Sequence, residues 1–543
     1  MSPILSRTLS FIAIPCLYAL VGWLNHVQLG KSVLLGAFAL LALSAWTNRN
    51  GDESHRGRLA NVFVALLFLL IIAYQGFLRD IFGVAQEDAL IMEAIFGTNG
   101  GETYEFILQN SHAFVKHIMV LLGIFALFAF FVLRQSPRPP ASGFFHSRTR
   151  RRTLAIVLIA IFALIHLNPT MRKENPLLYF PLRYLKWKKN VDQTRIVQER
   201  LASRLNEDQV LDGMRYAGNG KRTIVFILGE SSTRLNWSLY GYPRPTTPEM
   251  EALQGQLLKF TDVVTTSGGT ILDMQKILTP ATRTNPQLFQ EQPDIMTIAR
   301  KAGYKTFWIT NHSTDMTGLA SIFADSADET INANRGGSRS EGSYDEVVLP
   351  YLQQALIDPA PQKFIILHLL NAHPAYYFRY PKTFARFDNV NDAVHEELKE
   401  AGRAIWARKM RDQYDNAILY SDHVLRQSIA LCEKQSDQAI AWLYSPDHGE
   451  DVAHYSNFVG HNNRVLAMFE IPMLLWRSPN FLSSAVEDEV AAPRPYQTDQ
   501  LDHTLLGLMQ IEGDYYDAQR DILSATFSPL PRYVAGEPYP RAQ

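Results

Sequence analysis

The sequence predicts an α/β protein in two parts: an N-terminal transmembrane domain of five helices, then a domain with a mostly parallel central sheet. Two observations carry this prediction. Long apolar stretches are concentrated in the first third of the chain, and from about residue 220 onward short apolar runs alternate with helical stretches. Such alternation favours parallel strands joined by helices. At 543 residues the chain is also too long for one ordinary domain.

We expect the transmembrane domain over residues 1–168, interfacial and linker helices over 169–218, and the α/β domain over 219–543. A bilayer is crossed by a helix of roughly 20 apolar residues. The stretches that we assign as spans, of which the second and fifth are short, lie near 9–27, 32–47, 60–78, 113–133 and 153–168.

Arginines in the short loops set the orientation of these spans. Six arginines and no acidic residue occur in 134–152, and three arginines occur in 48–59, so both segments belong on the cytoplasmic side. Five crossings then place everything after about residue 169 outside the cytoplasm. The connection 79–112 lies outside as well, and its apolar positions suit an amphipathic helix at the membrane interface. A cleaved signal peptide is the alternative for the first stretch, but that stretch lacks a clear cleavage site and a second span follows at once.

Composition excludes some classes of function. The formal net charge is −1 and the pI is about 7.0, which gives no case for a nucleic-acid partner. The chain has two cysteines, Cys16 and Cys432, and Cys16 lies in an apolar stretch, so we expect no disulfide framework.

Polar residues follow several of the predicted strands. Glu230 comes after the apolar run 223–229, and Asp447-His448 come soon after 439–444; His312 and His373 follow two further runs. In open α/β sheets, ligand sites lie beyond the carboxyl ends of the strands. A single histidine or aspartate at a strand end is usually structural, but here several converge. Carboxylate and imidazole donors suit zinc, so we expect a catalytic metal site at this edge.

Four motifs resemble the membrane-bound phosphoethanolamine transferases of Gram-negative envelopes, within the alkaline phosphatase/sulfatase superfamily. Individually only the Asp-His-Gly-Glu motif is more than suggestive, but together they are specific. The motifs are Gly229-Glu230-Ser231 with Ser238-Leu239-Tyr240-Gly241-Tyr242, the segment 265–271 (Thr-Thr-Ser-x-x-Thr-Ile), His368 and His373 before Tyr376-Tyr377, and Asp447-His448-Gly449-Glu450 with Gly460-His461.

The resemblance implies an alkaline-phosphatase-like periplasmic domain on a multi-pass anchor in the bacterial inner membrane. It implies that Thr270 is the nucleophile and that Glu230, Thr270, Asp447 and His448 hold zinc, with His373 and His461 holding the phosphate or a second metal ion. A threonine hydroxyl is a weak nucleophile, and metal coordination is one way to activate it. The implied donor is phosphatidylethanolamine. The implied acceptor is lipopolysaccharide core, lipid A or a periplasmic glucan.

Two departures from the lipid A-modifying members bear on the acceptor and the donor. Those members carry a disulfide pair flanking the nucleophile, where this chain has Ser267 and Leu278, and the Thr-Ile context is closer to the branches that modify lipopolysaccharide core or glucan. Their membrane-facing loop contacts the headgroup through an asparagine, a threonine and a glutamate. Thr98 and Glu102 match by spacing, but Ala94 stands at the asparagine position.

Several alternatives stay open from the residues. Thr270 could instead cap a helix, and His368 reads better as a core histidine or one that supports a ligand. The same site could transfer phosphoglycerol or hydrolyse phosphodiesters. A sulfatase activity is disfavoured because no Cys/Ser-x-Pro-x-Arg motif lies near Thr270. A non-catalytic scaffold is disfavoured because all four predicted zinc-site residues are present.

Overall fold

The computed structural model describes the chain in segments that fall into two compact units. The described residues are 35, 36, 39, 48–49, 52–53, 55–82, 92, 100–134, 148–172, 176–203, 211, 213–312, 320–334, 344–481 and 488–539. The first unit comprises Met1–Met92 and Asn110–Lys189, and the second comprises Glu93–Gln109 and Asn190–Gln543. Each unit is described by itself.

The first unit is helical. Helix α3 packs against α6, with the Phe77 and Phe114 ring centroids 4.2 Å apart. Buried Phe68 and Leu69 of α3 belong to an apolar cluster that also includes Leu121 of α6. A two-residue hairpin, β1 with β2, precedes α3. The elements are β1 (Asn48–Arg49), β2 (Asp52–Glu53), α3 (His55–Phe82), α6 (Ser111–Arg134), α7 (Arg148–Ile165) and α8 (Pro169–Arg172), and α9 (Pro176–Ser203) runs on into the second unit.

Three of the five predicted spans fall on helices: 60–78 on α3, 113–133 on α6 and most of 153–168 on α7. The stretch 9–27 and most of 32–47 lie outside the described residues. Within the part of the chain that the structure describes, we find no helix with both the length and the apolar character needed to cross a membrane. The five-span topology stays a prediction.

The second unit is built on a seven-stranded mixed sheet with the strand order β5-β13-β10-β4-β9-β7-β8. The five strands from β10 to β8 are parallel, and β13 is antiparallel to both of its neighbours. The strands are β4 (Arg222–Gly229), β5 (Leu257–Phe260), β7 (Lys305–Thr310), β8 (Glu329–Asn332), β9 (Gln362–His368), β10 (Ala439–Pro446) and β13 (Met473–Arg477). The predicted α/β domain with a mostly parallel sheet is confirmed.

Both faces of this sheet are covered, which explains why its central strands are apolar throughout. Along β4, Ile224 and Phe226 belong to one hydrophobic cluster, and Val225 and Ile227 belong to the other. All four side chains are fully buried. Fully buried parallel strands read as continuous apolar runs rather than as alternating ones.

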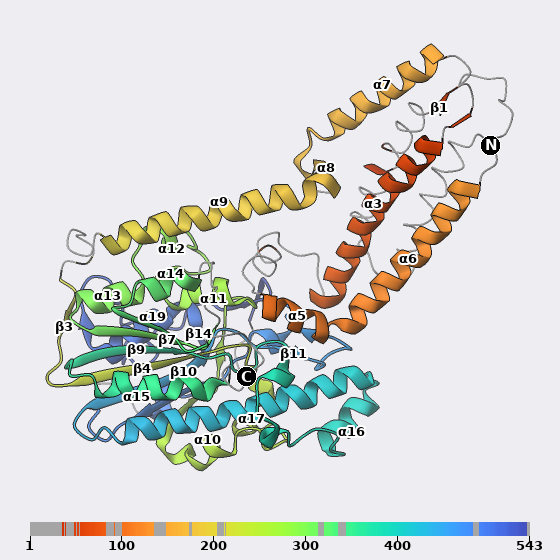
Figure 1. Cartoon of the computed structure of the whole chain (residues 1–543). Helices are drawn as coiled ribbons and strands as arrows, with labels where there is room; N and C mark the ends of the chain where they lie inside the picture. The colour runs from red at the N-terminus through yellow and green to blue at the C-terminus, as the bar shows by residue number, and fades with distance from the viewer. Residues whose placement is uncertain are drawn as a thin grey trace. The chain divides into compact units, whose positions relative to one another are not determined.

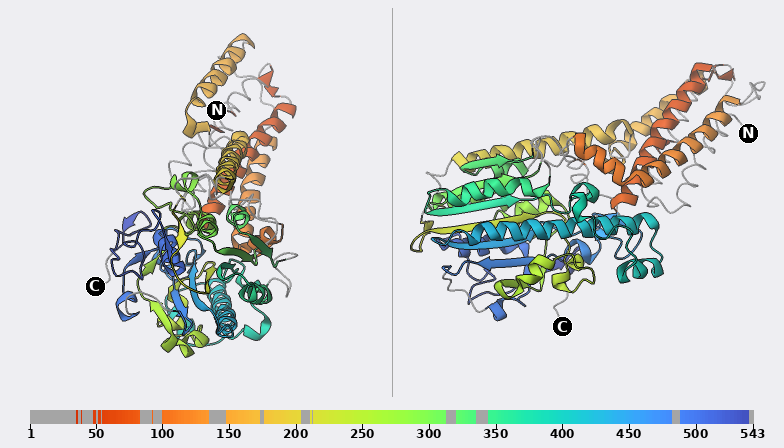
Figure 2. Two further views of the ribbon diagram at one scale, coloured as in Figure 1. Left: turned by 90° about the vertical axis from the view of Figure 1, so that its left-hand side faces the viewer. Right: turned by 60° about the horizontal axis from the view of Figure 1, so that its bottom comes forward.

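Different helices supply the two clusters. One face carries α11, α13, α14 and α19, and the opposite face carries α10, α15 and the long α17, which lies along the sheet in several views (Figures 1 and 2). Their bounds are α10 (Pro248–Ala252), α11 (Thr270–Ile277), α13 (Ile295–Lys301), α14 (Ala320–Asp325), α15 (Leu349–Ile357), α17 (Ile405–Glu433) and α19 (Leu501–Met509). The unit also includes α5 (Gly100–Gln109), α12 (Leu288–Glu291), α16 (Ala393–Glu400) and α18 (Asp488–Ala491).

Short strands pair around the sheet. They are β3 (Arg215–Tyr216) with β15 (Ile511–Glu512), β6 (Val263–Val264) with β14 (Tyr496–Gln497), β11 (Asp451–Val452) with β12 (Val459–Gly460), and β16 (Tyr533–Val534) with β17 (Glu537–Pro538). The pairing of β6 with β14 fixes the chain just before α11, the helix that opens with Thr270.

Candidate active site

Two neighbouring parallel strands deliver the acidic residues of the site. In the ladder of β4 and β10, Gly229 pairs with Pro446, so Glu230 and Asp447 leave the sheet side by side. The Asp447 backbone N–H donates to the Gly229 carbonyl at 3.0 Å, which extends the pairing past the strand ends. Glu230, Asp447 and His448 are all buried.

Thr270 lies against this group. It is the first residue of α11, and Gly269 occupies the N-cap position, so the alternative in which Thr270 caps the helix is wrong. Its Oγ1 lies 3.3 Å from each carboxylate oxygen of Glu230 and 3.3 Å from His448 Nε2. The side chain is half-buried, so it stays reachable at the edge of the sheet.

The ligand atoms are spaced for a single metal ion. His448 Nε2 lies 3.5 Å from Glu230 Oε1 and 3.5 Å from Asp447 Oδ2. Tetrahedral ligands about 2.0–2.2 Å from zinc lie roughly 3.3–3.6 Å from one another. Glu230, Asp447, His448 and Thr270 therefore fit zinc in both donor type and spacing.

Hydrogen bonds to the ligands support the same assignment. His448 Nδ1 lies 2.7 Å from the Gly449 carbonyl, which can only accept, so Nδ1 carries the hydrogen and Nε2 keeps its lone pair toward the site. Asp447 Oδ1 accepts from the Ser231 and His448 backbone N–H groups at 3.1 and 2.7 Å. Asp447 Oδ2 is buried and has no hydrogen-bond partner among the described residues. Such an orphaned carboxylate oxygen is costly unless a cation satisfies it.

Burial and like charge set the electrostatics of the site. Burial raises the pKa of Glu230 well above its ordinary value, and the neighbouring Asp447 carboxylate raises it further. Burial also raises the pKa of Asp447. Without a cation the two carboxylates repel each other and favour protonation, so a divalent ion would bind here in competition with protons.

Asp273 organises the start of α11. Its carboxylate accepts hydrogen bonds from the hydroxyl groups of Thr265, Thr266 and Ser267 and from the Ser267 backbone N–H, at 2.7–2.9 Å. Thr265 Oγ1 also lies 2.7 Å from the Asp447 carbonyl. The network therefore ties the segment before Thr270, and the helix that Thr270 begins, to the strand end that carries Asp447.

His373 and His461 lie near this group. The His461 ring contacts the His448 ring edge-on at 4.7 Å. Burial lowers the pKa of both His373 and His461 well below the ordinary value, and His448 adds to the lowering in both. Both imidazoles are therefore neutral near pH 7 and offer N–H donors or nitrogen ligands.

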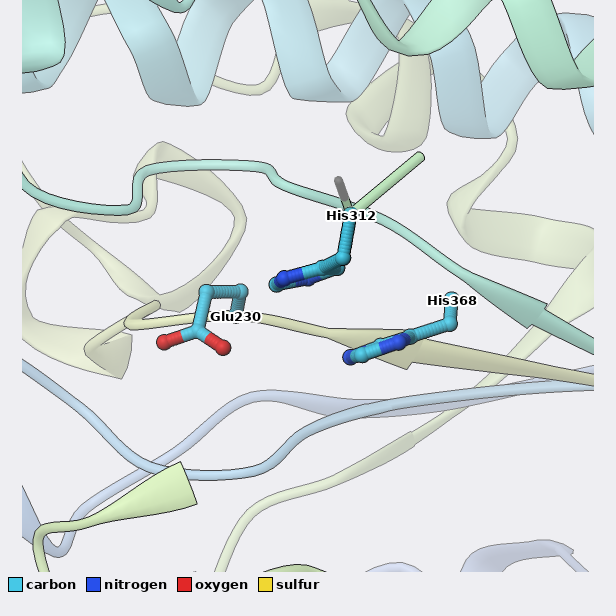
Figure 3. Close-up of side chains that lie close together, drawn as sticks. All are labelled: Glu230, His312 and His368. Atoms are coloured by element: carbon cyan, nitrogen blue, oxygen red, sulfur yellow. The ribbon is translucent and has the colours of Figure 1, made fainter. Parts of the chain in front are cut away.

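Two further groups of side chains could hold a metal ion. His448, Glu450 and His461 form one, and His461 Nε2 lies 3.2 Å from Glu450 Oε2 without a hydrogen bond between them. Glu230, His312 and His368 form the other. Figure 3 shows the two imidazole rings of that second group lying nearly parallel beside Glu230. The ring centroids are 3.9 Å apart and the ring planes differ by 10°. Imidazole lone pairs lie in the ring plane, so parallel rings do not direct them at one point, and this group is the poorer candidate.

Backbone strain marks the loops that carry the site. Ser231, Asn371 and Ala375 have positive φ values of 51°, 38° and 70°, and none of them is glycine. Ser231 directly follows Glu230, and the other two flank His373. Strain of this kind persists only where the surroundings hold it, and it gathers at functional sites.

The other predicted site residues come from the segment before α6. Glu102 lies in α5, and Thr98 lies outside the described residues. The structure therefore brings Glu230, Thr270, Asp447 and His448 together, and it describes no contact for the pair matched to the donor headgroup. Sequence reasoning gave no role to Asp273 or His312, although His312 was visible as a polar residue at a strand end.

Comparison with known proteins agrees with this fold. The Sulfatase family model matches residues 222–511, just over half of the chain. The chain therefore belongs to the sulfatase family. The range contains Glu230, Thr270, Asp447 and His448.

Individual relatives show which members of this family the chain resembles. Phosphoethanolamine transferase EptC of Escherichia coli (strain K12) is 36% identical over 354 residues, which cover 62% of this chain and 60% of that protein's length. A crystal structure of the C-terminal periplasmic domain of EptC from Escherichia coli, in complex with Zn, aligns with a TM-score of 0.55 at 35% identity over 58% of this chain and 90% of that one.

A third likeness extends over nearly the whole chain. Lipooligosaccharide phosphoethanolamine transferase A of Neisseria meningitidis, described as an integral membrane protein, aligns with a TM-score of 0.63 over 97% of this chain and 98% of that one. At 18% identity this shows a shared fold alone.

Proposed function

We propose that this chain transfers phosphoethanolamine from phosphatidylethanolamine to an acceptor of the bacterial envelope, by way of a phosphoethanolamine group carried on Thr270. The observation that supports it most is the position of Thr270 Oγ1, 3.3 Å from both Glu230 and His448 Nε2. A hydroxyl so close to potential metal ligands is suited to act as a nucleophile. The phosphoethanolamine transferase EptC, 36% identical to this chain over 354 residues, points to the group transferred.

The transfer has two displacement steps. In the first, Thr270 Oγ attacks the phosphorus, the bond from phosphorus to the diacylglycerol oxygen breaks, and diacylglycerol leaves as an alcohol with the proton that the threonine gives up. In the second, an acceptor hydroxyl or phosphate oxygen attacks the same phosphorus and the threonine oxygen is released with a proton. Charge on the phosphoryl oxygens is spread in both steps, so fixed donors near them stabilise the transition state.

Different residues of the chain would hold the metal ion, the phosphoryl group and the ethanolamine group. Glu230, Asp447 and His448 would hold zinc beside Thr270, and the ion would favour the threonine alkoxide and offset phosphoryl charge when bound. His373 and His461 would donate N–H groups to the phosphoryl oxygens, which suits their neutral state. Glu102 and Thr98 would contact the ethanolamine group.

We further propose that the enzyme is a multi-pass protein of the inner membrane with its catalytic unit in the periplasm. The apolar stretches of the first third and the arginine-rich loops support this topology. The similar domain of EptC from Escherichia coli is periplasmic, which agrees with it. A lipid donor gives a reason for the anchor. The Thr-Ile context favours lipopolysaccharide core or a periplasmic glucan as the acceptor over lipid A.

Intact-mass spectrometry tests the covalent step. Incubated with phosphatidylethanolamine and no acceptor, the purified chain should gain the mass of one phosphoethanolamine group, with peptide mapping to Thr270. Thr270→Ala should gain nothing and lose activity by about 10³-fold or more, whereas Thr383→Ala, an exposed threonine, should behave as wild type. An adduct that survives Thr270→Ala would contradict the proposal. Phosphatidylglycerol in place of phosphatidylethanolamine distinguishes phosphoglycerol transfer.

A further inference from the structure

Helix α5 is held within the catalytic unit by a buried ion pair. The Glu105 carboxylate, on the second turn of α5, accepts from Nη2 of Arg379. The side chains are 2% and 1% exposed, so the pair is shielded from water. The segment Glu93–Gln109 belongs to the same compact unit as the sheet, although Asn110–Lys189 of the other unit separate it in the sequence from Asn190, where the unit with the sheet resumes.

Arg379 also donates hydrogen bonds to the backbone of the segment that carries His373. Its Nε donates to the His373 carbonyl at 3.1 Å, and its Nη2 donates to the Pro374 carbonyl at 2.9 Å. One planar guanidinium therefore joins α5 to the backbone of a predicted phosphate-binding residue. The rigid fork of donors in arginine favours such shared geometry.

A buried pair of this kind is sensitive to the loss of either partner. Removing one side chain leaves the other charge without its counter-ion in a low-dielectric environment. Tyr104, Ile107 and Leu108 of α5 are 41–49% exposed, whereas Glu105 is buried. The ion pair is therefore a buried contact between α5 and the residue that holds the His373 segment.

We propose that the Glu105–Arg379 pair is a positioning device that holds α5 beside the His373 side of the active site, so that α5 forms part of the donor-lipid site. The proposal rests on the phosphoethanolamine transfer proposed above. Glu102, the residue matched to headgroup contact, lies one helical turn before Glu105. An error of about 1 Å in placing a substrate contact can cost roughly 100-fold in rate, so the pair would govern use of the lipid donor without touching it.

The first arm of the test measures docking without any enzyme assay. Amide hydrogen exchange is followed in the full-length, zinc-loaded protein in detergent, for wild type, Glu105→Ala and Glu105→Gln. The control is Glu512→Gln, which alters an exposed ion pair with Arg215. Glu105→Ala should raise exchange in residues 100–109 and leave β10 and α17 unchanged. Glu105→Gln keeps an acceptor for Arg379, so its exchange in residues 100–109 should lie between that of wild type and that of Glu105→Ala. Unchanged exchange in 100–109 would overturn the proposal.

The second arm separates positioning from chemistry. Turnover is measured with phosphatidylethanolamine and with bis(p-nitrophenyl) phosphate, a soluble phosphodiester without an ethanolamine group. Glu105→Ala should lower kcat/KM for the lipid by about 10- to 100-fold and leave turnover of the soluble ester within about twofold. Arg379→Ala, which also frees the His373 segment, should lower both.

The outcomes are distinct. Equal losses for both substrates in Glu105→Ala would show a merely structural role and overturn the proposal, as would unchanged use of the lipid. If the wild-type chain turned over the soluble ester but not the lipid, the proposed transfer would fail, whatever the exchange data showed about docking.

Discussion

His448 can offer one nitrogen to a metal because the other is already engaged. Its Nδ1–H donates to the carbonyl of its own neighbour Gly449, and this local bond is set by the backbone just after β10. Asp447 uses one oxygen in the same way, for two backbone N–H groups, and leaves the second toward the site. His448 and Asp447 are therefore prepared for coordination by hydrogen bonds with backbone groups, from sequence neighbours and, for Asp447, also from Ser231 at the end of the adjacent strand.

The raised pKa of Glu230 predicts how metal-free protein responds to pH. An acid whose native pKa lies above its unfolded value, here 4.5, binds more protons in the folded state between those two values. By linkage, that group's contribution to stability falls as pH rises through the window. Glu230→Gln removes this loss, so the chelator-treated variant should unfold at a higher temperature than wild type at pH 8, with a difference that shrinks toward pH 4.5.

Thermal unfolding in a chelator from pH 4.5 to 8 checks this prediction, and Glu512→Gln, an exposed carboxyl, controls for loss of a surface charge. Added zinc should reverse the order at pH 8, because it stabilises wild type and finds one ligand fewer in the variant. A wild-type protein that remained the more stable one in chelator at pH 8 would contradict the account of Glu230.

The site residues that lie in sequence motifs could be predicted, whereas the residues that hold them in place through hydrogen bonds and ion pairs could not. Glu230, Asp447 and His448 stand directly beyond apolar runs, which made them visible. Asp273 and Arg379 act through contacts between distant segments: Asp273 is linked through Thr265 to the Asp447 carbonyl, 182 positions from Thr265, and Arg379 reaches Glu105, 274 positions away. No local pattern marks such a contact.

Helix α11 begins at Thr270, the proposed nucleophile, and its start is fixed by side-chain hydrogen bonds. The resemblance implied that relatives close this region with a disulfide where this chain has Ser267 and Leu278. Here Ser267 instead donates from its hydroxyl and its backbone N–H to Asp273 on the first turn of the helix. Polar contacts therefore brace the helix start in this chain.

Removing the Asp273 carboxylate should disturb the position of Thr270. Asp273→Ala removes the carboxylate that accepts from the hydroxyl groups of Thr266 and Ser267 and from the Ser267 N–H, and it leaves Thr265 with the Asp447 carbonyl alone. Loss of a supporting contact around a metal site typically costs about 10- to 100-fold in metal affinity or activity. We expect kcat with phosphatidylethanolamine to fall by that factor, with less effect on KM. Steady-state kinetics checks the change, and Asp273→Asn, which keeps one acceptor oxygen, should be milder. A loss confined to KM would contradict the positioning role.

Strands with both faces buried could be predicted from the sequence, whereas the edge strands of the sheet could not. The predicted runs at 223–229 and 439–444 correspond to β4 and β10, and the two runs that precede His312 and His373 correspond to β7 and β9. The two edge strands, β5 and β8, have four residues each and only partial burial, with patterns that mix polar and apolar residues. Short edge strands carry too little apolar sequence to stand out.

For the whole molecule, the topology of the sheet explains why one edge holds the site. Parallel strands β4, β9, β7 and β10 all end at the same edge, so residues from four distant segments meet there. The family match over 222–511 covers this entire edge. The α/β class and the position of the site at this edge could be predicted from the sequence, because every central strand is a continuous apolar run followed by polar residues. The assignment of Glu93–Gln109 to the catalytic unit did not follow, because it depends on contacts between distant segments.

The measurement that bears most directly on the central claim is anomalous scattering at the zinc absorption edge, from crystals of the full-length protein prepared with zinc. The account predicts a strong peak about 2.0–2.2 Å from Glu230, Asp447 and His448, with the Thr270 hydroxyl among its ligands. A peak elsewhere with none at this position, or a Thr270 hydroxyl turned away from the ion, would contradict it.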